Sequence, residues 1–149
     1  MSPDATTFFG TFTPRLDEKG RLTLPAKFRS RLERGIVLTR GQDKCIYGWT
    51  PDDFGVFADR MRQLSFTDAG ARNFVRMFFS GMREEMPDKQ GRVPIPSVLR
   101  TWASLERECT VVGAMDRIEI WDSARWDEFQ TNLETPFSEM SEEVMPGIF

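Results

Sequence analysis

Two short stretches of the chain alternate between polar and apolar residues and share one pattern. Residues 21–24 read Arg-Leu-Thr-Leu, and residues 92–95 read Arg-Val-Pro-Ile. Alternation with a period of two predicts a strand with one buried face. Each stretch follows a tight turn, at residues 17–20 and 88–91, where Asp bonds the backbone two residues on and Gly adopts positive φ without steric penalty. A Pro follows each strand and can open a short helix, so the predicted unit is strand, turn, strand and helix.

These units belong to an internal repeat. Residues 8–29 align with residues 79–100 at a constant offset of 71 and without a gap. The identical pairs are Phe8 and Phe79, Gly10 and Gly81, Asp17 and Asp88, Gly20 and Gly91, Arg21 and Arg92, Pro25 and Pro96, and Arg29 and Arg100. Two copies are too few for a solenoid, so we expect two similar modules packed as a pseudo-dimer within one chain.

Further strands and helices complete each copy. Apolar runs predict strands at residues 36–39, 45–49, 110–112 and 118–121. Cap residues predict helix starts, because Ser, Thr, Asp and Asn side chains satisfy the first backbone N–H groups. These caps are Thr50, which Pro51 follows, Asp122, and the pair Thr67-Asp68, which comes after a break in helical spacing at residues 65–67.

This organisation predicts an α+β fold in four parts. A first module occupies residues 8–54, a helical bridge residues 55–78, a second module residues 79–133, and an acidic, mobile tail residues 134–149. The bridge is rich in Met and Phe, which are typical of a core and are also enriched at subunit interfaces. Pro94 lacks a backbone N–H, so its strand must lie at a sheet edge or be very short.

Charge is distributed unevenly along the chain. The net charge is −3 and the pI about 5.1, which is not the basic profile of a typical DNA-binding domain. Residues 15–40, however, carry eight basic residues and three acidic ones, whereas residues 83–108 carry five of each. Residues 119–149 hold one basic residue and eight acidic ones. This asymmetry predicts that the first copy contacts phosphate and that the second is structural.

Enzyme chemistry is poorly supported by the residue inventory. The chain has no His, which excludes His-based triads and His metal ligands. Cys45 and Cys109 lack a C-x-x-C partner and lie in predicted strands, so we expect buried apolar side chains in a reducing compartment. We expect no enzymatic activity, no cofactor, no metal and no small-molecule substrate. The chain shows no signal peptide and no apolar run of about 20 residues, so we expect a cytoplasmic protein that does not act at a membrane.

The repeated motif resembles a known DNA-binding element. Residues 16–25, Leu-Asp-Glu-Lys-Gly-Arg-Leu-Thr-Leu-Pro, are similar to the swapped-hairpin element of AbrB-type proteins. The double copy, over residues 8–133, resembles the MraZ family of bacterial transcriptional regulators. The resemblance implies two tandem AbrB-like modules and a ring-shaped homo-oligomer, an octamer or larger. It also implies action at the nucleoid, through binding to double-stranded promoter DNA at repeated boxes ahead of the division and cell-wall gene cluster.

The first Asp-x-x-Gly-Arg motif is the candidate DNA contact. Arg21 and Lys19 lie at or beside the turn, where they can reach phosphate or a groove edge. Weaker candidates for backbone contacts are Arg15, Lys27, Arg29 and Arg31.

A structural role for the same motif is expected in the second copy. Asp and Arg four residues apart can bridge a turn with a charge-assisted hydrogen bond. The residues of this structural motif are Asp17, Gly20, Asp88, Gly91 and Arg92. An alternative function is a non-enzymatic, antitoxin-like or scaffold module whose basic face meets an acidic protein.

Overall fold

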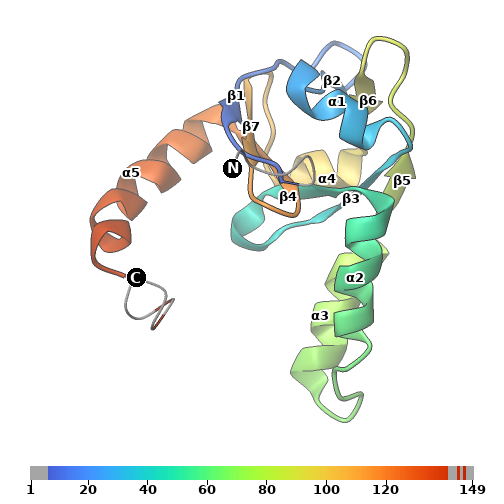
Figure 1. The fold of residues 1–149 in the computed structure, drawn as a ribbon, viewed down its shortest axis with the longest axis vertical. Coiled ribbons are helices and arrows are strands. Elements are labelled where there is room, and N and C mark those ends of the chain that lie inside the picture. Colours follow the sequence, from blue (N-terminus) through green and yellow to red (C-terminus); the bar gives the residue numbers. More distant parts are fainter. Residues whose placement is uncertain (1–6, 141–143, 145, 147–149) are drawn as a thin grey trace.

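A six-stranded antiparallel sheet, built from both copies of the repeat, is the centre of the fold (Figure 1). The computed structural model describes residues 7–140, 144 and 146. In these residues the strands of the six-stranded sheet follow the order β1-β7-β8-β4-β3-β5, and β2 and β6 form a second, two-stranded sheet. Helices pack on both faces, so the chain has the expected α+β fold.

The helices and strands follow the repeat along the chain. The strands are β1 (Thr11–Phe12), β2 (Arg21–Thr23), β3 (Ile36–Arg40), β4 (Ile46–Trp49), β5 (Arg83–Glu85), β6 (Arg92–Pro94), β7 (Cys109–Gly113) and β8 (Ile118–Asp122). The helices are α1 (Ala26–Leu32), α2 (Pro51–Met61), α3 (Ala69–Ser80), α4 (Ser97–Trp102) and α5 (Ser123–Glu139), with a 3₁₀ turn at Gln42–Lys44.

Each copy gives its first strand to the other copy. β1 of the first copy pairs with β7 of the second, with Thr11 opposite Val112. β5 of the second copy pairs with β3 of the first, with Val37 opposite Glu84. The central strands β4 and β8 also join the two copies. Neither copy therefore completes the sheet by itself, which explains why the repeat forms one body.

The two-stranded sheet ties the turn of each copy to the strand of the other copy. Leu22 of β2 lies opposite Val93 of β6. Beyond the strands, the N–H of Leu24 donates to the carbonyl of Gly91 at 2.8 Å, and the N–H of Ile95 donates to the carbonyl of Gly20 at 2.9 Å. The strand that contains Pro94 has only three residues. This confirms the expectation that the strand lies at an edge or is very short.

The six-stranded sheet is covered on both faces, and each face has its own core. On one face, the two-stranded sheet, α1 and α4 form a hydrophobic cluster with residues of the six-stranded sheet. The members that come from β2, β6 and the positions directly after them are Leu22, Leu24, Val93 and Ile95. On the other face α2, α3 and the start of α5 cover aromatic residues, and Trp49 stacks on Phe57 with ring centroids 4.7 Å apart. The expected bridge is therefore partly core.

The expected helix starts are observed. Thr50 Oγ1 accepts from the N–H of Asp53, and the carboxylates of Asp68 and Asp122 accept from the N–H groups of Gly70 and Arg125. α2 and α3 form a hairpin that projects from the sheet, and α5 projects from another part of it (Figure 1). No helix among the described residues is long and apolar enough to cross a membrane.

The last helix is longer than the sequence indicates. α5 ends at Glu139, six residues into the segment expected as an acidic, mobile tail. Most of the remaining residues of that segment, namely 141–143, 145 and 147–149, lie outside the described part of the chain.

Leu22→Ala tests the shared core. Leu22 is fully buried between the two copies, so we expect a loss of about 2–5 kcal/mol in the free energy of unfolding. Because the copies share one sheet, the loss should appear in a single urea transition followed by circular dichroism. Val98→Ala on the exposed surface of α4 is the control and should change stability by less than about 0.5 kcal/mol. Two separate transitions would contradict a shared core.

Candidate nucleic-acid interface

Two tight turns, one from each copy, lie at opposite ends of the two-stranded sheet, because each turn precedes its own strand and β2 and β6 run antiparallel. Gly20 has a φ of +75° and Gly91 a φ of +76°, as expected for left-handed turn positions. The N–H of each Gly donates to the carbonyl of the Asp three residues before it, at 3.0 Å for Asp17 and 2.9 Å for Asp88. The backbone bonds between the turns and the opposite strands hold this pair in one arrangement.

An Asp–Arg bridge, here called the turn clamp, closes each turn. Arg21 Nε donates to Asp17 Oδ2, and Arg92 Nε donates to Asp88 Oδ2, both at 2.7 Å. The other oxygen of each Asp accepts two backbone N–H groups at 2.9 Å. These bonds, first among them the one from the backbone N–H of the Arg, lower the pKa of Asp17 and of Asp88. The clamp geometry is the same in both copies.

An Arg from each short helix lies on the Gly turn of the opposite copy. Arg29 of α1 covers Gly91, and its Nε donates to the carbonyl of Leu24 at 3.0 Å. Arg100 of α4 covers Gly20 in the same way, and its Nη1 donates to a carbonyl of its own copy at 2.6 Å. A Cβ at either Gly would collide with the guanidinium above it. The two glycines therefore provide room for an Arg as well as a positive φ.

The other predicted contact residues lie in different surroundings. Lys19 is exposed on the first turn, beside Arg21. Arg15 is exposed but pairs with Glu108 at 3.0 Å, and the Lys27 Nζ lies 3.6 Å from the centroid of the Phe9 ring.

Arg31 is the least exposed of the predicted contacts. Its guanidinium pairs with Asp53 at 3.3 Å and lies over the ring of Phe8 at 3.6 Å. The structure therefore brings Lys19 and Arg21 together at the turn, and it places Arg29 at the seam between copies and Arg31 against the core.

The structure places further basic residues beside the first turn, and a charge count for each copy separately does not identify them. A hollow of about 580 Å³ beside the first turn is lined by Lys19 and by Arg100 and Arg107 of the second copy, together with Asp17, Glu18 and Glu106. Lys89 is exposed on the second turn. Because the copies exchange strands, residues from the neutral copy surround the turn of the basic one. The candidate surface is thus composite, and the hollow has equal numbers of basic and acidic lining residues.

The described residues offer little for catalysis. They contain no group of three or more His, Cys, Asp or Glu side chains that could hold a metal ion. Cys45 and Cys109 are buried and form no disulfide. Burial raises the pKa of both thiols, that of Cys109 to about 11, so neither is poised to act as a thiolate nucleophile at neutral pH.

Asp88→Asn tests the stabilising role of the turn clamp. A folded-state pKa below the ordinary value of about 3.9 means that ionised Asp88 stabilises the fold above that pH and that this stability is lost as pH falls through the folded pKa. The wild type should therefore lose thermal stability as the pH falls below about 4. The variant should be less stable than the wild type at neutral pH, and it should lose less thermal stability on acidification. Asp127→Asn, an exposed acid on α5, is the control, and an unchanged acid profile in Asp88→Asn would contradict the role.

Comparison with known proteins identifies the family. A family model described as "MraZ protein, putative antitoxin-like" matches residues 7–77 and again residues 78–145, in agreement with the two copies. The Transcriptional regulator MraZ of Clavibacter michiganensis subsp. michiganensis is 54% identical over 142 residues, covering 95% of this chain and 99% of the relative. The proteins of the same name from Micrococcus luteus and Parafrankia sp. are 51% and 50% identical, with the same coverage. The chain belongs to the MraZ family.

Proposed function

We propose that the chain is a sequence-specific, DNA-binding transcriptional regulator without enzymatic activity. The carrying observation is the pair of clamped turns, which the two-stranded sheet joins in one fixed arrangement, with Lys19 and Lys89 exposed on them. The relatives named Transcriptional regulator MraZ support this role. Following the family resemblance, the target is promoter DNA ahead of the division and cell-wall gene cluster, and the site of action is the cytoplasm, at the nucleoid.

DNA contact is assigned to the first turn and its surroundings. Lys19 and Arg21 are the primary contacts, and Arg15 and Lys27 add exposed positive charge nearby in the sequence. Arg29 and Arg31 contribute through their charge and by fixing the turn pair and α1, since both are engaged with protein groups. Phosphate contacts of this type orient the protein, and base contacts from the same turns then select the sequence.

Several chains acting together supply the affinity. One chain presents few cations at the turns, so a single contact should resemble nonspecific binding. A ring-shaped homo-oligomer, an octamer or larger, would engage repeated boxes at once. Effective concentration would then raise the affinity by a factor of roughly 10² to 10⁴ without a new kind of contact.

An interaction module is the second candidate. Its basic residues would bind an acidic protein, and the equal numbers of basic and acidic residues around the hollow beside the first turn fit a protein partner better than the charge of the first copy alone indicates. Salt dependence separates the two functions, because DNA binding releases counterions and weakens linearly on a log–log plot with a slope that counts phosphates.

Matched substitutions in the two turns test the division of labour. Lys19→Ala should weaken binding to the protein's own upstream DNA and reduce the salt slope by about 1, whereas Gln90→Ala at the equivalent position should leave both unchanged. Arg21→Ala and Arg92→Ala each remove one clamp, so they should lose similar stability, and Arg21→Ala should lose more DNA affinity. Fluorescence anisotropy at several salt concentrations measures these effects. Equal losses of affinity from the two well-folded Arg variants would contradict a DNA-facing first copy.

The oligomer model is tested with DNA that carries one box or several phased boxes. We expect a gain in affinity of roughly 10² to 10⁴ for several boxes, together with a multi-chain species in sedimentation velocity of the DNA-unbound protein. A monomer that binds one box as tightly as several would rule out avidity.

A further inference from the structure

The apolar stripe of α5 is covered over only its first half. Trp126 and Phe129 pack against Trp121 of β8, with ring centroids 5.3 and 4.7 Å away. The stripe continues at four-residue spacing with Leu133 and Phe137, which are 38% and 73% exposed. Residues 130–139 are all exposed. An amphipathic helix normally turns such a stripe towards a partner surface.

This second half of α5, here called the α5 arm (residues 130–139), gains little stability from its own chain. Isolated helices shorter than about 12–15 residues are marginal in water. Pro136 lies inside the helix, where it removes one backbone hydrogen bond. The arm therefore needs a surface that covers Leu133 and Phe137.

Charge restricts the kind of surface that fits the arm. After Arg125 the helix carries four acidic residues and no basic one, and the sequence remains free of basic residues to its end. The acids within the helix are Asp127, Glu128, Glu134 and Glu139. The complementary surface should be apolar with a basic edge.

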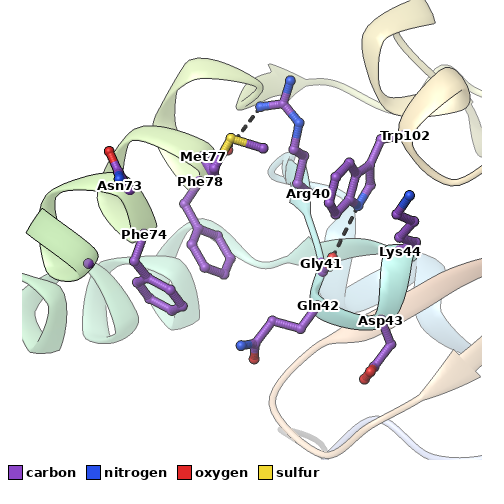
Figure 2. Close-up of a pocket in the computed structure, with 11 residues that line it drawn as sticks. Arg40, Gly41, Gln42, Asp43, Lys44, Asn73, Phe74, Met77, Phe78 and Trp102 are labelled. Atoms are coloured by element: carbon purple, nitrogen blue, oxygen red, sulfur yellow. Dashed lines mark hydrogen bonds between the residues drawn. The ribbon is translucent and has the colours of Figure 1, made fainter.

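A groove with these properties lies between α3 and the β3–β4 loop. Its volume is about 470 Å³, and Phe74, Met77 and Phe78 of α3 face Trp102 across it (Figure 2). Arg40 and Lys44 lie on the edge, with their charged groups 5.8 and 5.7 Å from the Trp102 ring.

The groove is held in shape by hydrogen bonds. Trp102 Nε1 donates to the carbonyls of Gly41 and Cys45 at 3.1 and 3.0 Å. Arg40 Nη1 donates to the carbonyl of Met77 and to Ser80 Oγ at 3.0 and 3.1 Å. The groove is thus formed before any partner arrives, and rigid sites lose less entropy on binding.

The balance of charge around the groove is positive. Arg40 and Lys44 line it together with one acid, Asp43. α3 has no acid within its bounds, and its Arg76 donates to Asn73, which lines the groove. The acidic arm and the basic groove are therefore complementary.

We propose that the α5 arm of one chain docks in the α3 groove of a second copy. Leu133 and Phe137 then cover Phe74 and Met77, and the acids of the arm lie near Lys44. This inference rests on the homo-oligomer proposed above and assigns the contact that builds it.

The geometry favours a second copy over the arm's own chain. The arm and the α2–α3 hairpin leave the sheet in different directions and end far apart (Figure 1). Pairing of two α5 arms with each other would bring their acidic side chains together, and these like charges would repel each other. Each chain then gives an arm to one neighbour and a groove to another, and head-to-tail contacts of this kind generate a ring when the rotation closes.

Mixed disulfide trapping tests which surfaces meet. A Leu133→Cys chain is mixed with a Met77→Cys chain and oxidised; the native thiols, Cys45 and Cys109, are buried. We expect linked pairs that contain one chain of each kind, and none when Val56→Cys, at an exposed position on α2, replaces Met77→Cys. Links between two Leu133→Cys chains alone would assign the partner as another arm, and the absence of mixed links would leave the groove to a different ligand. Either result overturns the proposal.

Sedimentation velocity of the full chain tests the energetic role of the contact. Phe137→Asp should convert the multi-chain species to monomers and abolish the gain in affinity for several DNA boxes, with binding to one box retained. Phe66→Ser is the matched control, because Phe66 is 80% exposed and lies outside the groove; it should keep the wild-type size.

The possible failures of the proposals are distinguishable. If Phe137→Asp keeps the wild-type size, the arm contact is wrong while the oligomer stands. If the wild type itself is a monomer, both are wrong. If the wild-type protein does not bind even one box, the DNA-binding function is wrong and the arm contact is unaffected.

Discussion

Backbone hydrogen bonding between the two copies is the constraint on which the rest of the structure depends. A buried N–H or carbonyl group without a partner is costly, and each copy supplies strands whose partners are found in the other copy. β1 pairs with β7, β5 pairs with β3, and β2 pairs with β6. The side chains follow this pairing: Leu22 and Val93 become buried because the strands that carry them are brought together over the sheet.

The same pairing determines the composition of the candidate DNA surface. Once β2 and β6 are paired, each Gly turn lies beside the end of the opposite strand, and the helices that follow place Arg29 and Arg100 across the opposite turns. Basic residues of each copy therefore lie against the turn of the other copy. Arg100 and Arg107 lie beside the first turn, although they come from a segment with no net charge. The DNA surface is a property of the pair of copies, so a charge count for one copy describes it incompletely.

The parts of the chain outside this pairing have a different character. The α2–α3 hairpin and α5 pack on the sheet through Trp49, Phe57 and Phe129, and then extend beyond it with apolar side chains exposed. A closed core holds the turns in place, whereas the two extensions present a basic apolar groove and an acidic apolar arm. The division suits the proposed function, in which single contacts with DNA are weak and assembly supplies the affinity.

The sequence by itself determined the local features. It predicted the turns, the positive φ of Gly20 and Gly91, the helix starts at Thr50 and Asp122, and the strand alternation, because each depends on residues within a few positions. Only the tertiary structure decided which strands exchange, that Arg29 covers the opposite turn, and that α5 extends to Glu139. Those features depend on contacts between residues some 45 to 100 positions apart or on exposed surface, and neither leaves a local pattern. Because the two copies are similar, strands could pair within a copy or between copies. The free energy of the complete core selects between these alternatives.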